Sequence, residues 1–405
     1  MRTAALALAA LLTIGNADAR TWRIRTGAGA EQALQTALIE ARPGDTVRLP
    51  RGRLELSGGL SLDVDRVTIR GEGEGRSVLS FTNQRRGAEG LLITADGVLL
   101  RDFAVENARG DAIKIRDCAG ITIRGVRTEW TRGPHPENGA YGLYPVNCSN
   151  VLIERSIARG ASDAGIYVGQ SRNIIIRDNL AELNVAGIEI ENSFNADVFG
   201  NTATRNTGGV LVFDLPGLPQ QGGHEIRVFD NVIRGNNTPN FAPAGNIVAS
   251  VPTGTGVLIM ANRNVHVFEN EIGNHGTVNV LITAYRNTFQ DAHYNPLARD
   301  IVIRDNRFGD AGAAPAGDLA ALAQMGVVMP DVLWDGATLY SAGGTPRTET
   351  VRIVMRDNRS TRTGQASFLS LGLAAAGSPL TEAVPDPALP PLLAVTEPEP
   401  VRIRN

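Results

Sequence analysis

Cysteine, histidine and lysine are scarce in this chain. Its 405 residues include two cysteines, five histidines and a single lysine, Lys114, and all other basic residues are arginines. Two cysteines without a histidine cluster do not provide a metal site. The formal net charge of −3 is small and spread along the chain, so we expect neither nucleic acid nor an anionic membrane surface as a partner.

Long apolar runs are also missing beyond the N-terminus. Residues 1–19 combine Arg2, an apolar run over 4–14 and the small-residue pattern Ala17-Asp18-Ala19. These features predict a cleaved bacterial signal peptide, which is too short to span a bilayer. No later stretch is long and apolar enough for a membrane span. We therefore expect an exported protein, periplasmic or secreted.

A recurring asparagine is the main positive signal. Segments of the form hydrophobic-x-hydrophobic-x-x-Asn align six asparagines, with spacings of 22, 30, 39, 36 and 52 residues. Repeats of this length indicate a solenoid, and short alternating strands bounded by Gly, Asn and Asp indicate a β-helix. We expect the asparagines to stack in a tight bend with left-handed backbone and to be structural. They are Asn179, Asn201, Asn231, Asn270, Asn306 and Asn358.

The pattern predicts an all-β, single-domain right-handed parallel β-helix with an N-terminal capping helix at 31–41. Insertions at 131–140, 215–224, 236–254 and 286–299 interrupt the repeats at turns and should project from one side of the rod. The predicted parts are a signal peptide (1–19), an N-terminal cap with the first coils (20–97), regular coils (98–309), an irregular insertion with the last coil (310–371) and a Pro-rich extended tail (372–405).

Cys118 and Cys148 fall at the same position of adjacent coils. Stacked strands lie about 4.8 Å apart, which is compatible with a disulfide in an exported protein. A stack of small side chains, continued by Ser171 and Ser193, is the alternative. Both interpretations stay open on the sequence.

A second strand series lies between the asparagine-bearing strands, and its alternation predicts two outward columns. The first column is Lys114, Tyr144, Tyr167, Glu189, Leu211, Leu258 and Leu281. The second is Arg116, Val146, Gly169, Glu191, Phe213, Met260 and Thr283. The apolar end of these columns needs a cover, either residues 310–348 or the Pro-rich tail.

The charged and aromatic end of the columns is the predicted site. Glu189 and Glu191 should emerge on one face roughly 7 Å apart, where they could bind Ca²⁺ or divide acid and base roles. No other cofactor is expected. Tyr144 and Tyr167 offer apolar faces with hydroxyl tips for a sugar, and Lys114 could neutralise an acidic one. Arg116 could share that role.

His135 and Glu137 lie on the loop between two coils and could lean over this face. A solvated polar sheet surface with ordinary charge pairs is the alternative to a site.

Residues 139–285 resemble a known family. The stretches GAYGLYPVNCSNVLIE, DAGIYVGQSRNIIIRDN, NVAGIEIENSFNADVFGN and NTGGVLVFDLPGLPQQGG carry the resemblance, with NNTPNFAPAGNIVASVPTGTG and VLIMANRNVHVFEN. They are similar to exported bacterial parallel β-helix repeat proteins of the pectate-lyase-like superfamily, often encoded beside di-haem c-type cytochromes. The resemblance implies the fold and a possible c-type cytochrome partner.

One departure from the superfamily is informative. Mannuronan C5-epimerases carry Tyr-Gly-x-Asp-Pro-His with a catalytic Asp and His, whereas this chain has Tyr141-Gly142-Leu143-Tyr144-Pro145-Val146. Tyr144 and Val146 occupy the Asp and His positions, which puts that chemistry in doubt here. Two hypotheses follow. One is recognition, with cleavage or epimerisation, of a polysaccharide along the Lys114–Glu191 face. The other is a non-catalytic periplasmic binding or assembly protein acting with a cytochrome.

Overall fold

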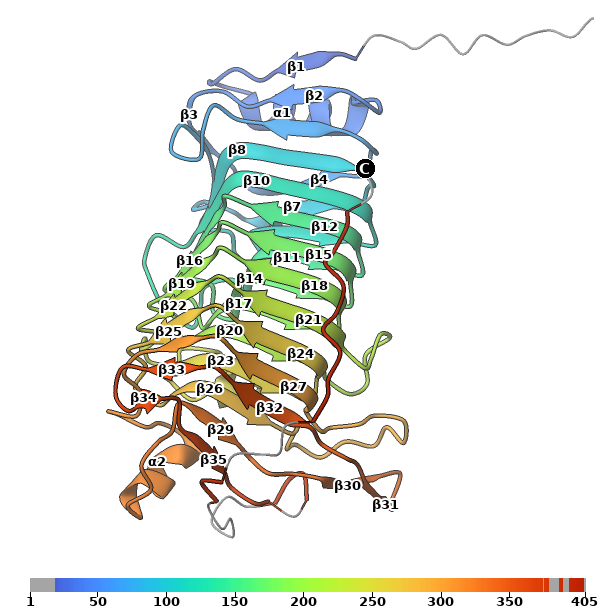
Figure 1. Cartoon of the computed structure of the whole chain (residues 1–405). Helices are drawn as coiled ribbons and strands as arrows, with labels where there is room; N and C mark the ends of the chain where they lie inside the picture. Colours follow the sequence, from blue (N-terminus) through green and yellow to red (C-terminus); the bar gives the residue numbers. More distant parts are fainter. Residues whose placement is uncertain (1–18, 374, 379–385, 389–392, 404–405) are drawn as a thin grey trace, which may run out of the picture.

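The chain coils into a stack of parallel strands, as its repeats predict (Figure 1). The structure is a computed structural model that describes residues 19–373, 375–378, 386–388 and 393–403. The predicted signal peptide therefore falls almost entirely outside the described residues. No described helix is long and apolar enough to cross a membrane.

One side of the stack is an 11-stranded parallel sheet, called sheet B here. Its strands supply the predicted second series. They are β4 (Gly58–Leu62), β7 (Arg86–Ile93), β9 (Ile113–Arg116), β11 (Tyr141–Val146), β14 (Ala164–Gly169), β17 (Ala186–Glu191), β20 (Gly208–Phe213), β23 (Thr255–Met260), β26 (Val278–Thr283), β29 (Val332–Trp334) and β35 (Phe368–Ser370).

The other sides form one bent sheet, sheet A, because the long strands β8 (Val98–Glu106) and β10 (Ala119–Glu129) each pair with strands of two legs. The first leg also contains β1 (Thr21–Arg23), β2 (Thr46–Arg48), β5 (Thr68–Arg70), β12 (Ser149–Glu154), β15 (Arg172–Arg177), β18 (Phe194–Phe199), β21 (His224–Phe229), β24 (Arg263–Phe268), β27 (Arg299–Arg304) and β32 (Ile353–Arg356). The second contains β3 (Gly52–Glu55), β6 (Ser77–Ser80), β13 (Ile157–Arg159), β16 (Leu180–Glu182), β19 (Thr202–Thr204), β22 (Val232–Arg234), β25 (Glu271–Gly273), β28 (Arg307–Phe308), β33 (Arg359–Ser360) and β34 (Gly364–Gln365).

One small helix caps the N-terminal end of the solenoid, and a second lies against the outer face of sheet B. Helix α1 (Ala30–Glu40) buries Leu34 and Leu38 against the first coils, which confirms the capping helix. The segment expected to be irregular after residue 310 contains α2 (Asp318–Gln324), β29 and the antiparallel hairpin of β30 (Leu339–Ala342) and β31 (Thr345–Thr348).

The core lies inside the coils and follows the predicted alternation. Ile166 and Val168 of β14 and Ile188 and Ile190 of β17 have no exposed surface. Burying such aliphatic side chains contributes roughly 1.5–3 kcal/mol each, so the inward columns supply the main stabilisation.

The six aligned asparagines form the expected ladder. Each side-chain amide donates to Oδ1 of the next asparagine at 2.9–3.0 Å. The expected left-handed backbone is wrong for the asparagines themselves: the preceding residues adopt it, for example Asp178 at φ 57° and Asp230 at φ 55°. A second ladder of Asn184, Asn206 and Asn236 ends on His275.

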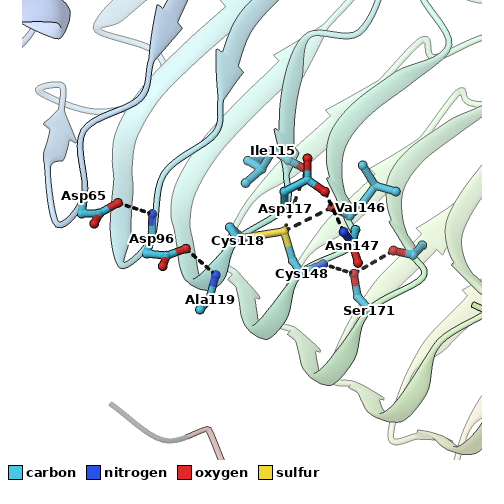
Figure 2. The surroundings of a disulfide bond; sticks show 11 residues. Asp65, Asp96, Ile115, Asp117, Cys118, Ala119, Val146, Asn147, Cys148 and Ser171 are labelled. Atoms are coloured by element: carbon cyan, nitrogen blue, oxygen red, sulfur yellow. Dashed lines mark hydrogen bonds between the residues drawn. A yellow bond between two sulfur atoms is a disulfide. The ribbon is translucent and has the colours of Figure 1, made fainter. Parts of the chain in front are cut away.

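Cys118 and Cys148 form a disulfide, with their Cα atoms 4.6 Å apart (Figure 2). The next position of the column continues with hydrogen bonds, because the backbone N–H of Cys148 donates to the Ser171 hydroxyl. The disulfide and the hydrogen-bonded stack of small side chains, which were alternatives on the sequence, therefore both occur in this column, in successive coils.

Two expectations about the coverings need correction. The insertions containing Val248 and Tyr294 fold down over sheet B instead of projecting, and they pack on Leu211 and Leu258 together with Leu319 of α2. The 310–348 alternative is thus confirmed as part of the cover of the apolar columns.

Leu373, near the start of the predicted tail, packs in the same apolar cluster on sheet B. The last described stretch of the tail, 393–403, runs along sheet A instead (Figure 1). Glu397 contacts Arg227 and Arg304, and the Val401 N–H donates to Asp197. The tail alternative for the apolar cover is therefore wrong for these residues.

Candidate functional site

Three tyrosines gather on the outer face of sheet B. Tyr141 and Tyr144 come from β11 and Tyr167 from β14, and their ring centroids lie 4.3–4.9 Å apart. The strand register aligns Tyr144 with Lys114 on one side. The predicted first column is thus confirmed at this point. Tyr141 and Tyr144 are half-buried, whereas Tyr167 is buried.

Three carboxyl groups lie against the tyrosines. Glu189 and Glu191 point outward from β17, and Asp163 precedes β14. The Tyr167 hydroxyl donates to Glu191 Oε1 at 2.7 Å, and Tyr141 lies close enough to Asp163 to lower the pKa of its carboxyl group. We call these six residues the tyrosine–carboxyl cluster: Tyr141, Tyr144, Tyr167, Asp163, Glu189 and Glu191.

The carboxyl groups are buried, which contradicts the alternative of a solvated polar sheet surface. Glu189 is 1%, Asp163 4% and Glu191 7% exposed. No arginine or lysine among the described residues forms an ion pair with any of the three. Oδ1 of Asp163 and Oε2 of Glu189 also have no hydrogen-bond partner. A buried carboxylate without a counter-charge is costly, which favours the protonated form.

The electrostatics follow from that burial. Burial raises the pKa of Glu191 to about 7 against a hydrogen bond from Tyr167, which lowers it. Burial and the negative charge of Glu191 raise the pKa of Asp163 to about 7. Burial raises the pKa of Glu189 well above its usual range, with further increases from Asp163 and Glu191. The raised pKa values mean that at least one carboxyl group of the Glu189–Glu191 pair stays protonated near neutral pH.

The tyrosines stay neutral for the same reason. Burial, followed by the nearby carboxyl charges, raises the pKa of Tyr141, Tyr144 and Tyr167 above the ordinary value. They therefore act as hydrogen-bond donors at neutral pH, not as phenolate bases.

Lys114 marks the more open end of the face. Its Nζ lies 3.4 Å from Asp111, 3.9 Å from Glu89 and 4.9 Å from the centre of the Tyr144 ring. Burial raises the pKa of Asp111, and Lys114 lowers it. The lysine is three-quarters buried and lies where a ligand stacked on Tyr144 would meet a cation.

The remaining predicted residues lie apart from the cluster. Arg116 is exposed and approaches Asp117 at 3.9 Å. His135 and Glu137 lie on the exposed loop before β11, where Arg132 contacts Glu137 at 3.3 Å. Within the described part of the chain, neither loop residue forms a hydrogen bond or ion pair with the cluster.

The segment that covers the site was not predicted from the sequence. Asn246, from the insertion between β22 and β23, donates to Asp163 Oδ2 at 3.3 Å. The adjoining 3-10 helix η1 (Ile247–Ser250) continues over the sheet. Asp163 precedes β14, Tyr141 is the first residue of β11 and Asn246 sits in an insertion, so the strand alternation did not point to them.

No group of three or more His, Cys, Asp or Glu among the described residues has the geometry to hold a metal ion. The arrangement offers instead a neutral aromatic platform, one cation at its edge and a buried pair of carboxyl groups with raised pKa values.

Comparisons with known proteins agree with this architecture. A family model described as "Right handed beta helix region" matches residues 62–217. No curated protein matches the sequence significantly.

Solved structures similar to this chain include DFA-IIIase from Arthrobacter chlorophenolicus A6 without its lid in complex with GF2. The TM-score is 0.57 at 12% identity, over 86% of this chain and 91% of that chain. The A-module of mannuronan C-5 epimerase AlgE6 from Azotobacter vinelandii gives a TM-score of 0.50 at 16% identity, over 86% and 95%. Pectate lyase Pel9A gives a TM-score of 0.43 at 12% identity, over 87% of this chain and 82% of that chain. At identities this low, the first two matches show that this chain shares their fold, and nothing beyond it.

Proposed function

Because this chain is a right-handed parallel β-helix protein, we propose that it recognises an acidic polysaccharide along sheet B. In this proposal Lys114, Tyr144 and Tyr167 bind the saccharide, and Glu189 and Glu191 supply acid and base for its cleavage or epimerisation. The observation that carries the proposal is the packing of three tyrosines beside three buried carboxyl groups on one solenoid face, with Tyr167 hydrogen-bonded to Glu191.

Recognition uses the more open half of the face. Tyrosine rings present apolar surfaces that suit the C–H faces of a sugar, and their hydroxyl groups suit its oxygen atoms. The ammonium group of Lys114 would neutralise a uronate carboxylate. A solenoid repeats its surface along the axis, which suits an extended polymer.

Proton transfer would use the buried half. A base removes the proton next to the uronate carboxyl group, which is easier once Lys114 neutralises that carboxylate. In cleavage, the acid then protonates the departing glycosidic oxygen and leaves an unsaturated sugar end. In epimerisation, the acid returns a proton to the opposite face. The raised pKa values of the Glu189–Glu191 pair support both roles, since one carboxyl group stays protonated near neutral pH.

The test is a panel of uronate polysaccharides and oligosaccharides incubated with the purified protein. Binding is measured calorimetrically, unsaturated ends by ultraviolet absorbance, and the epimer ratio by NMR. We expect at least one member to bind, and Glu189→Gln to keep binding while abolishing turnover. An absence of binding by every member would refute the proposal.

A non-catalytic role in periplasmic binding or assembly is the second candidate. It is favoured by the closure of Asn246 and η1 over the carboxyl groups and by Val146 at the epimerase histidine position. A c-type cytochrome is the proposed partner in that case. Co-elution of a haem protein from the native host, together with silence in the uronate panel, would select this candidate.

We also propose that the protein is exported. The Cys118–Cys148 disulfide supports this, because such bonds persist mainly in oxidising compartments. Cell fractionation of the native host tests the location.

A further inference from the structure

A cavity of about 490 Å³ adjoins the tyrosine–carboxyl cluster on sheet B. Its floor includes Phe213, Leu258, Met260 and Leu281, the apolar end of the two outward columns. The register aligns Phe213 with Glu191. The floor therefore begins one strand, about 4.8 Å, beyond the carboxyl pair.

The cavity is lined mainly by apolar side chains, with polar groups at Ser250, Thr283, Asn287 and Asp335. Ile247 and Pro252 belong to one wall, and Leu319 of α2 belongs to another. An ion pair between Arg286 and Asp318, at 3.2 Å, also contributes to the lining. Sites of this size with apolar walls and a few polar groups are typical of small-molecule pockets.

The floor residues keep a small exposed surface that the core lacks. Leu258, Met260 and Leu281 are 4%, 6% and 7% exposed, whereas their inward neighbours Val257 and Ile259 are 0% exposed. The floor thus faces open space, and an apolar ligand would remove this remaining surface from water.

One segment covers both the tyrosine–carboxyl cluster and the cavity. Asn246 contacts Asp163 of the cluster, and the next residue, Ile247, lines the cavity. A single ligand lying along sheet B would therefore meet tyrosines and carboxyl groups first and aliphatic side chains immediately afterwards.

We propose that the cavity binds an aliphatic chain, and that the ligand is an amphipathic saccharide carrying an alkyl or acyl group. The saccharide part of this inference rests on the proposed function, whereas the aliphatic part rests on the cavity alone. Leu and Met side chains favour a flexible aliphatic chain because they adapt their shape to it.

The experiment measures binding of methyl, butyl and octyl β-D-glucuronides by calorimetry, each below its critical micelle concentration, with 1-octanol as the sugar-free probe. Each buried methylene should tighten binding about threefold, so octyl glucuronide should bind at least about 100-fold more tightly than the methyl compound. Affinity that does not change with chain length would overturn the inference.

Two matched variants locate the effect. Ala249 is exposed and lines the cavity, whereas Ala244 is exposed on the same segment and does not line it. Ala249→Trp should remove the dependence on chain length, and Ala244→Trp should keep it. Equal behaviour of both variants would overturn the assignment of the chain to this cavity.

The two proposals fail in different ways. Uronate oligosaccharides that bind while an alkyl chain adds nothing would leave the proposed function standing and refute the cavity ligand. Binding of 1-octanol that Ala249→Trp abolishes, with no gain from any sugar, would support the cavity and count against the proposed function. Binding of alkyl probes only after removal of residues 379–405 would show that the chain's own end fills the cavity, and would overturn the inference.

Discussion

Tyr167 and Glu191 are joined by a hydrogen bond that runs diagonally across two strands. The register aligns Tyr167 with Glu189 and Gly169 with Glu191, yet the Tyr167 hydroxyl donates to Glu191 at 2.7 Å. The ring reaches that far because it lies over Gly169, where a Cβ atom would collide with the ring and its hydroxyl oxygen. A glycine in the second outward column thus permits the contact between the aromatic and acidic halves of the site.

Gly169→Ala should displace the Tyr167 ring and break its hydrogen bond to Glu191. Overpacking of this kind and the loss of a buried hydrogen bond each cost about 1–3 kcal/mol, so the free energy of unfolding should fall by about 2 kcal/mol or more. Urea denaturation measures the loss, and near-ultraviolet circular dichroism reports the tyrosines. Gly75→Ala is the control, because Cβ there meets no atom within 4 Å. Equal stability of the two variants would contradict the packing described.

The buried carboxyl groups should make the protein less stable as the pH rises. An unfolded glutamate has a pKa near 4.3, whereas burial raises the pKa of folded Glu191 to about 7. Between these values the folded state binds more protons than the unfolded state. The stabilisation is therefore complete below about pH 4, declines as the pH rises, and is lost above about pH 7.

Between pH 4 and pH 8, the free energy of unfolding of Glu191→Gln should decline by about 1–3 kcal/mol less than that of the wild-type protein. Chemical denaturation across that range gives the difference from the wild-type protein. Glu137→Gln, on the exposed loop, should leave the profile unchanged. A wild-type protein that gains stability relative to Glu191→Gln as the pH rises would rule out the protonated cluster.

The strand register could be predicted from the sequence because parallel stacking places residues at equivalent repeat positions next to each other in space. Tyr144 beside Lys114 and Glu189 beside Leu211 both follow from strand alternation alone. Burial of Glu189 could not be predicted in this way, because it depends on the path of the insertion that carries Asn246. That path is set by packing on the apolar columns and has no repeat of its own.

The position of the tail could not be predicted for the same reason, because it too depends on packing and not on the repeat. Residues 393–403 offer proline and apolar residues that suit either sheet, but Glu397 lies between Arg227 and Arg304 of sheet A. The two arginines belong to β21 and β27, which are far apart in sequence, so only the fold brings them close enough to select the tail.

Asn231→Ala should interrupt the asparagine ladder at its middle. The variant removes the donor to Asn270 and the acceptor for Asn201, leaving buried polar groups unpaired. Each unpaired group costs about 1–3 kcal/mol, so a loss of roughly 3 kcal/mol is expected from thermal and urea unfolding. Asn83→Ala, at an exposed turn, is the matched control and should change stability by less than about 0.5 kcal/mol. A similarly small effect at Asn231 would mean that the ladder does not stabilise the stack.

Deleting residues 393–405 should uncover His266 on sheet A. Burial lowers the pKa of His266 to about 4, and the pKa should rise toward the ordinary value near 6.5 once water reaches the ring. NMR titration of the histidine Cε1–H signals measures this, with exposed His135 as the internal reference. A His266 signal that still titrates near pH 4 would show that the tail is not its cover.

The most direct test of the proposed recognition uses the single lysine. Reductive ¹³C-methylation keeps the charge of Lys114 and gives one side-chain signal besides the N-terminal amine. Titration with uronate oligosaccharides should shift the Lys114 signal saturably, and Tyr144→Ala should weaken that shift by about tenfold or more. A Lys114 signal that stays unmoved by every acidic saccharide, while the protein remains folded, would contradict glycan recognition on this face.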